Sequence, residues 1–242
     1  RNVICLLWLV DFSIKGGLFM SEHVTYVANG GQTYQPCQDN VKVPFASYEK
    51  PAKPNPLLPE LELNQDAIDK MQKDIRIVYT PLHGTGNLPA RRVLKELGFE
   101  NVYVVKEQEL PDGNFPTVNY PNPESPAAFE LGLKLAKEVN ADLVLATDPD
   151  ADRLGVYVKD SKSGAYIPLT GNMSGSLLCD YVLSQKQAAG KIPADGEVVK
   201  SIVTTNLVDA IAASYDCELI EVLTGFKYIG QQILGFENSG KG

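Results

Sequence analysis

From Asp74 to Phe236, short apolar segments of strand type alternate with segments of helical spacing, and this alternation constrains the fold more than any other feature. Strands are expected at 75–79, 101–105, 142–147, 154–158, 166–169, 197–203 and 217–222. Helices are expected at about 64–73, 88–97, 127–139, 175–187, 207–214 and 226–236. Strands that alternate with helices favour largely parallel sheets joined by crossover helices. The sequence therefore predicts an α/β fold.

The alternation runs in two successive series, so we predict two consecutive α/β domains with mixed, largely parallel sheets and crossover helices. The first domain is expected at 71–168 and the second at 169–242. Residues 1–70 form a divergent N-terminal segment, in which the Pro-rich stretch 50–59 is typical of extended linker backbone. The apolar run at 3–10 is too short to cross a membrane, because a spanning helix needs about 20 apolar residues.

Charge and cysteine content exclude several classes of protein. Lys and Arg number 22 against 30 Asp and Glu, which gives a net charge of −8. A duplex nucleic-acid binder needs a basic face, so we expect no nucleic-acid partner. The short apolar run at 3–10 likewise leads us to expect no membrane partner. The 4 cysteines form no C-x-x-C pair and the chain has only 2 histidines, which argues against a zinc site or a disulfide framework. Reduced thiols, as in a cytoplasmic protein, are the expectation.

Three aspartates follow the expected strand at 142–147, namely Asp148, Asp150 and Asp152, and Arg153 closes the series. Ligands of open α/β sheets bind at the carboxyl ends of strands. Three adjacent carboxylates repel one another unless a cation lies between them, and their hard oxygen atoms suit Mg²⁺ or Ca²⁺ rather than Zn²⁺ or Cu²⁺. The guanidinium of Arg153 can pair with these carboxylates or face a phosphate that the same ion contacts.

Other acidic loops fit this spacing less well. An EF-hand loop beginning at Asp148 would need Gly and Glu where the chain has Arg153 and Lys159. A haloacid-dehalogenase-type phosphatase needs Thr or Val where the chain has Asp152. A solvated acidic turn is common for one Asp-x-Asp pair, but less so for three regularly spaced aspartates after a buried strand. A metal-dependent glycosyltransferase stays open, although it gives Asp152 and Arg153 no role.

Two more loops join an expected strand to an expected helix. Residues 80–87 (TPLHGTGN) contain glycines that permit a tight turn, and Asn87 is the expected N-cap of the next helix. Residues 223–227 (LTGFK) place Lys227 near a helix N-terminus, where its ammonium group can meet a phosphate. Neither loop is a Walker loop or a dinucleotide-binding fingerprint. Taken alone, the first loop is weak evidence, because His83 can equally be a hydrogen-bonded turn histidine. Taken alone, the second loop favours a surface lysine at Lys227 over a phosphate ligand.

Taken in order, these motifs resemble those of the α-D-phosphohexomutase superfamily, and most of all its bacterial-type phosphoglucomutase/phosphomannomutase members. The matching stretches are TPLHGTGN (80–87), FPTVNYPNPE (115–124), ATDPDADR (146–153), LTGN (169–172), VVKSIVTT (198–205) and LTGFKYIG (223–230). The resemblance implies an enzyme, an intramolecular phosphotransferase that needs Mg²⁺. Such an enzyme interconverts hexose 1-phosphate and hexose 6-phosphate through a phosphoserine and a bisphosphate intermediate.

The resemblance also implies roles for single residues. The implied Mg²⁺ ligands are Asp148, Asp150 and Asp152, with a phosphoserine oxygen as the fourth ligand. The implied catalytic residues are Arg153, beside the phosphate, and His83, which with Gly84 borders the active-site cleft. The residues implied to bind the hexose phosphate substrate are Thr224, Gly225 and Lys227.

Some family features have no counterpart in the chain. Residues 1–73 contain no serine loop of the T-A-S-H-N-P type, so no nucleophile is assigned. Residues 237–240 (ENSG) look like the family's sugar-binding loop but are expected to end a helix, and we expect no fourth domain among the 242 residues. We therefore expect a piece of a longer mutase, inactive or nearly so by itself. The alternatives are a non-catalytic sugar-phosphate-binding module and the glycosyltransferase, which uridine-nucleotide binding would favour.

Overall fold

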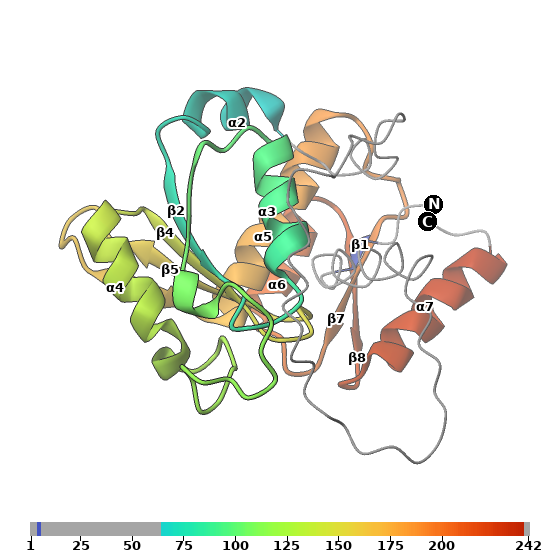
Figure 1. Ribbon diagram of the computed structural model, residues 1–242. Helices are drawn as coiled ribbons and strands as arrows, with labels where there is room; N and C mark the ends of the chain where they lie inside the picture. The colour runs from blue at the N-terminus through green and yellow to red at the C-terminus, as the bar shows by residue number, and fades with distance from the viewer. Residues whose placement is uncertain (1–3, 6–63, 240–242) are drawn as a thin grey trace, which may run out of the picture.

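The structure, a computed structural model, describes residues 4–5 and 64–239 (Figure 1). These residues form two sheets, one of five strands and one of three. The prediction of two consecutive α/β units with mixed, largely parallel sheets is confirmed. The Pro-rich stretch at 50–59 and most of the apolar run at 3–10 lie outside the described residues. The domain boundaries at 70/71 and 168/169 stay predictions.

The first sheet carries the aspartates. Its strands are β2 (Arg76–Thr80), β3 (Asn101–Val104), β4 (Leu143–Thr147), β5 (Leu154–Lys159) and β6 (Tyr166–Leu169). Their order is β3-β2-β4-β5-β6, with β2 parallel to β3 and β4 and with β5 antiparallel to β4 and β6. Thr80 lies beside Ala146 in this register. The loops that follow β2 and β4 therefore leave the same edge of the sheet.

Helices lie on both sides of the first sheet, as its largely apolar central strands β2 and β4 require. Figure 1 shows α4 (Glu130–Val139) on one side and α3 (Asn87–Glu96) on the other. Under α4, a buried cluster joins Ala136 of the helix to Val78 and Val144 of the sheet. Burial of such side chains is the main stabilising contribution of this layer. A short helix, α2 (Gln65–Met71), precedes the sheet.

The second sheet consists of β1 (Ile4–Cys5), β7 (Glu197–Ser201) and β8 (Glu218–Val222), all parallel, in the order β1-β7-β8. Its helices are α5 (Gly171–Ala188), α6 (Leu207–Ser214) and α7 (Phe226–Ser239). Neighbouring residues of β7 face opposite layers. Val198 belongs to the core beneath α5 and α6, and Val199 packs against Ile229 and Phe236 of α7. The sheet thus lies between α7 and the other two helices (Figure 1).

Local side-chain chemistry shifts several element ends from their expected positions. The prediction that Asn87 caps a helix is wrong, because Asn87 is the first residue of α3 and its amide donates to the Glu109 carbonyl over 2.8 Å. Helix α5 begins at Gly171 instead of 175, since the Thr170 hydroxyl accepts a hydrogen bond from the Met173 N–H. Residues 237–239 end helix α7, as expected for ENSG.

A buried lysine fixes the start of α6 to the second sheet. The side chain of Lys200 on β7 is fully buried. Its Nζ lies 2.5 Å from Asp209 and 3.3 Å from Glu221, and it donates to the Asn206 side chain over 3.0 Å. A buried ammonium needs such partners, because desolvation of an unpaired charge is costly. Sequence patterning gave no sign of this buried charge.

Cys179 and Cys217 are free, buried thiols of the second unit. Burial, with the negative charge of Asp180 nearby, raises the pKa of the Cys179 thiol to about 11. Only roughly 0.1% of such a thiol is ionised at pH 8, and the thiolate is the reactive form. We expect iodoacetamide to leave Cys179 unmodified in the native protein and to alkylate it in urea, as peptide mass spectrometry would record. Equal labelling rates in both states would contradict the burial of this residue.

Among the described residues, no helix combines the length and the apolar character that a membrane-spanning segment needs.

Candidate metal centre

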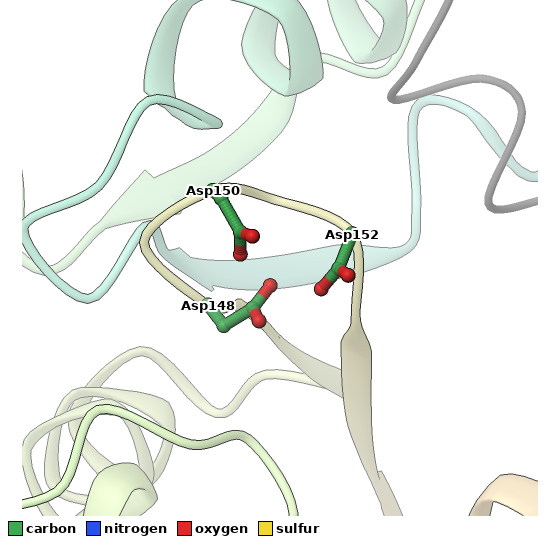
Figure 2. A group of neighbouring side chains, drawn as sticks. All are labelled: Asp148, Asp150 and Asp152. Carbon is green, nitrogen blue, oxygen red and sulfur yellow. The ribbon is translucent and has the colours of Figure 1, made fainter.

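The three predicted aspartates converge on one point. They lie on the loop between β4 and β5, and Figure 2 shows their carboxylates directed toward one another inside this loop. One carboxylate oxygen of each residue lies within 4.8 Å of the others. The turn that brings them together includes Ala151 in a left-handed conformation (φ 60°), whose N–H donates to the Asp148 carbonyl over 3.0 Å.

Asp148 is the fixed member of the group. It is 1% exposed, whereas Asp150 and Asp152 are exposed. Its carboxylate accepts two hydrogen bonds from Arg153, one from the backbone N–H over 2.9 Å and one from Nε over 2.8 Å. The same Nε lies 3.7 Å from Asp152. Arg153 therefore pairs with the aspartates, which is one of the two roles that its position predicts. Its side chain is nevertheless 46% exposed.

The pKa values of the aspartates reflect their crowding. Burial acts to raise the pKa of Asp148, but the hydrogen bonds from the Arg153 backbone and side chain outweigh it, so this pKa lies below its ordinary value. Burial raises the pKa of Asp152, and the negative charges of Asp148 and Asp150 raise it further. One guanidinium cannot neutralise three carboxylates. The loop therefore concentrates negative charge at a single point.

This donor set fits a hard divalent cation. All three donors are carboxylate oxygens, which Mg²⁺ and Ca²⁺ prefer. Oxygens on one face of a Mg²⁺ octahedron lie about 3 Å apart, given bond lengths of about 2.1 Å. The separations of up to 4.8 Å would have to shorten by less than about 2 Å, and the two exposed aspartates are free to make that adjustment. The carboxylates of Asp148, Asp150 and Asp152 could therefore hold such an ion.

The loop after β2, residues 81–86, supports the aspartate loop from outside. The N–H and the hydroxyl of Thr85 both donate to the Pro149 carbonyl, over 2.8 and 3.1 Å. Gly84 packs directly against the backbone of Pro149, and a Cβ added at position 84 would lie 2.4 Å from the Cα of Pro149. At the end of β2, the Tyr79 hydroxyl lies 2.9 Å from that of Thr147, at the end of β4. These contacts fix the backbone between Asp148 and Asp150.

His83 lies in this supporting loop, but its ring faces other protein groups. The residue is 5% exposed. Its Nε2 lies 2.8 Å from the Thr117 hydroxyl, and its Nδ1 lies 3.3 Å from the Leu110 carbonyl. Both ring nitrogens are therefore engaged within the protein. The catalytic role of His83 stays a prediction.

The predicted substrate-binding residues lie in the other α/β unit. Thr224 and Gly225 lie in the turn between β8 and α7, Lys227 lies in the first turn of α7, and all three are exposed. Gly225 has a φ of 136°, which favours glycine, and the Lys227 ammonium lies 4.8 Å from the ring centre of Tyr228. The substrate role of Thr224, Gly225 and Lys227 stays a prediction.

Sequence patterning missed the supporting residues. Gln108 ends a short 3-10 helix (Lys106–Gln108) after β3, at a position that periodicity does not mark. Thr117 belongs to the recognised stretch 115–124, but its bonds to His83 and Gln108 give it a role that no sequence pattern indicated. Thr85 belongs to a motif that was recognised, but its bonds to Pro149 join residues 64 positions apart.

The chain matches the sequence profiles of two domains of one family. Residues 52–164 match phosphoglucomutase/phosphomannomutase α/β/α domain II, and residues 170–241 match α/β/α domain III. Together the two matches cover most of the chain. The chain belongs to the phosphoglucomutase/phosphomannomutase family. The aspartate loop lies within the domain II match and residues 223–227 within the domain III match.

Relatives of this family from several bacteria share substantial sequence with the chain. A probable phosphomannomutase of Haemophilus influenzae is 43% identical over 169 residues, which make up 69% of this chain and 34% of that protein. A phosphoglucomutase of Staphylococcus saprophyticus is 41% identical over 160 residues, covering 66% of this chain and 28% of that protein. The chain therefore spans about a third of the length of the relatives it matches.

Solved structures of family members share the fold. A putative phosphomannomutase from Thermus thermophilus superposes with a TM-score of 0.51 at 22% identity, over 72% of this chain and 38% of that one. A phosphoglucomutase/phosphomannomutase family protein from Burkholderia thailandensis gives a TM-score of 0.52 at 22% identity, over 73% of this chain and 36% of that one. At this identity the comparison supports the α/β architecture alone.

Proposed function

We propose that the chain is the metal-binding and part of the sugar-binding portion of a phosphohexomutase, which interconverts hexose 1-phosphate and hexose 6-phosphate. The observation that carries the proposal is the convergence of three carboxylates at the carboxyl end of β4 in a chain of this family. The names of the relatives, phosphomannomutase and phosphoglucomutase, support the hexose phosphate substrate.

Within this proposal, Asp148, Asp150 and Asp152 hold Mg²⁺. The oxygen-only donor set supports Mg²⁺ over softer metals. When bound, the ion would neutralise negative charge on a transferring phosphoryl group. Arg153 holds Asp148 with its backbone N–H and Nε, while the exposed remainder of its guanidinium can meet a phosphate oxygen.

We assign the exposed turn of Thr224, Gly225 and Lys227 to the substrate. The ammonium of Lys227 and the backbone N–H groups at the start of α7 can both attract a phosphate. A cytoplasmic location is part of the proposal, supported by the free thiols of Cys179 and Cys217.

The experiment compares the chain with its full-length parent. We expect the parent to convert glucose 1-phosphate or mannose 1-phosphate to the 6-phosphate in Mg²⁺ with catalytic bisphosphate, and to lose this activity in EDTA. We expect the isolated chain to be inactive, since no nucleophilic serine is assigned to it. Turnover by the isolated chain would contradict the expectation that it lacks the nucleophilic serine. An inactive parent that binds a uridine nucleotide would contradict the mutase and favour the glycosyltransferase.

A further inference from the structure

A continuous series of side-chain hydrogen bonds runs behind the aspartate loop. The Thr80 hydroxyl donates to Gln108 Oε1 over 2.6 Å, and Gln108 Nε2 donates to the Thr117 hydroxyl over 3.1 Å. That hydroxyl lies 2.8 Å from His83 Nε2, and His83 Nδ1 lies 3.3 Å from the Leu110 carbonyl. The series joins the end of β2 to the segment 108–117 and returns to the loop after β2.

The Leu110 carbonyl sets the bond directions for a neutral His83 ring. A carbonyl oxygen can only accept, so Nδ1 is the donor toward Leu110. In that tautomer Nε2 is an acceptor, and the Thr117 hydroxyl donates to it. The same hydroxyl accepts from Gln108 Nε2. Thr117 therefore acts as donor and acceptor at once, and no alkyl side chain can replace it.

The hydrogen bonds of His83 stabilise a backbone conformation that would otherwise be unfavourable. Leu82 and His83 have φ values of 46° and 61°, in the left-handed region that residues with a Cβ rarely adopt. The backbone of His83 is bonded on both sides, its N–H to the Gln108 carbonyl over 3.0 Å and its carbonyl to the Asp112 N–H over 3.1 Å. The ring and the backbone of His83 thus fix this turn to the same neighbouring segment.

The next two residues after His83 transmit this constraint to the aspartates. Gly84 lies against the backbone of Pro149, and Thr85 donates twice to the Pro149 carbonyl. Pro149 separates Asp148 from Asp150. A shift of residues 82–85 would therefore move the backbone that sets the separation of these two carboxylates.

We propose that His83 and Thr117 are positioning residues for the aspartate cluster: their hydrogen bond holds residues 82–85 in the conformation that fixes Pro149 and so the separation of Asp148 and Asp150. The inference rests on the proposed metal centre. It gives His83 a role through the aspartate loop in place of direct contact with the substrate.

The test compares two substitutions at one position. Thr117→Val removes the hydroxyl at nearly constant volume, and Thr117→Ser keeps it. We expect Thr117→Val to weaken Mn²⁺ binding, measured by electron paramagnetic resonance with Mg²⁺ competition, by about tenfold, as for other residues that orient metal ligands. Thr117→Ser should bind Mn²⁺ within about twofold of the unaltered chain.

A distant hydroxyl provides the control for general destabilisation. Thr170→Val removes the hydroxyl that caps α5, so it should lower the melting temperature and leave Mn²⁺ affinity unchanged. If Thr117→Val does not fold, His83→Gln and His83→Ala replace it, because Gln retains an oxygen that can accept from Thr117. His83→Gln should then bind Mn²⁺ more tightly than His83→Ala.

Each outcome decides a different claim. Equal Mn²⁺ affinity in Thr117→Val and the unaltered chain would overturn the positioning role while leaving the metal centre intact. Equal weakening in Thr117→Val and Thr117→Ser would also overturn it, since the hydroxyl would then be irrelevant. If the unaltered chain binds no Mn²⁺, the proposed metal centre fails, and the inference fails with it.

Discussion

Replacement of Asp150 by asparagine is expected to lower the affinity of the chain for Mg²⁺ by more than about a hundredfold. The loss of residues that only orient metal ligands costs about 10–100-fold, and the loss of a ligand should cost more. Asp150 is exposed, and the new amide has nearly the same shape as the carboxylate. Its replacement removes a charge and one of the two carboxylate oxygens without opening a cavity, and the neutral amide oxygen that stays is a weaker ligand for Mg²⁺. The fold should therefore persist while metal binding is lost.

Calorimetric titration with Mg²⁺ measures this loss, and the melting temperature with and without Mg²⁺ gives a second readout. Mg²⁺ should raise the melting temperature of the unaltered chain but not that of Asp150→Asn, because a ligand stabilises the fold only when the folded state binds it. Asp195→Asn removes the same charge from an exposed position in the other unit and serves as the matched control. An Mg²⁺ affinity unchanged by Asp150→Asn would show that Asp150 is not a ligand.

Replacement of Gly84 by alanine is expected to destabilise the chain by about 3 kcal/mol and to weaken Mg²⁺ binding as well. The added Cβ would lie 2.4, 2.6 and 2.8 Å from the Cα, O and C atoms of Pro149. These are backbone atoms, which cannot rotate out of the way as the end of a side chain can. The aspartate loop must therefore move, and the hydrogen bonds from Thr85 to Pro149 must break or lengthen.

Urea denaturation gives the change in the free energy of unfolding, and Mg²⁺ titration gives the change in affinity. Gly113→Ala is the control, because a Cβ at Gly113 would meet no atom within 4 Å. Gly113→Ala should change the free energy of unfolding by no more than about 0.5 kcal/mol, as other surface substitutions do. If Gly84→Ala were as mild as Gly113→Ala, the close contact between the two loops would be absent.

The sequence predicted those parts of the molecule that depend on local pattern. The apolar runs ending at Thr80 and Thr147 gave the central strands, because their period and length are set by burial between helices. The aspartate cluster was also predictable, since closely spaced carboxylates directly after a buried strand share one loop. Their convergence in Figure 2 agrees with that prediction.

The contacts between loops could not be predicted in this way. Whether residues 81–86 meet the aspartate loop depends on the register of β2 against β4, which pairs Thr80 with Ala146. No local pattern specifies this register. The burial of the Gln108 side chain could not be predicted either, because Gln108 lies in a segment after β3 that has no helical or strand periodicity. Asn87 was misassigned because the carbonyl that its amide reaches, that of Glu109, belongs to this segment.

The proposed function depends on one divalent cation held by the aspartate loop. Paramagnetic broadening of backbone amide resonances by Mn²⁺ tests this site most directly. Sub-stoichiometric Mn²⁺ should broaden the amide resonances of residues 147–153 and 84–86 first, and excess Mg²⁺ should restore them. Asp150→Asn should show no such selective broadening. Broadening that begins elsewhere in the chain, or that Mg²⁺ does not reverse, would contradict a metal centre at Asp148, Asp150 and Asp152.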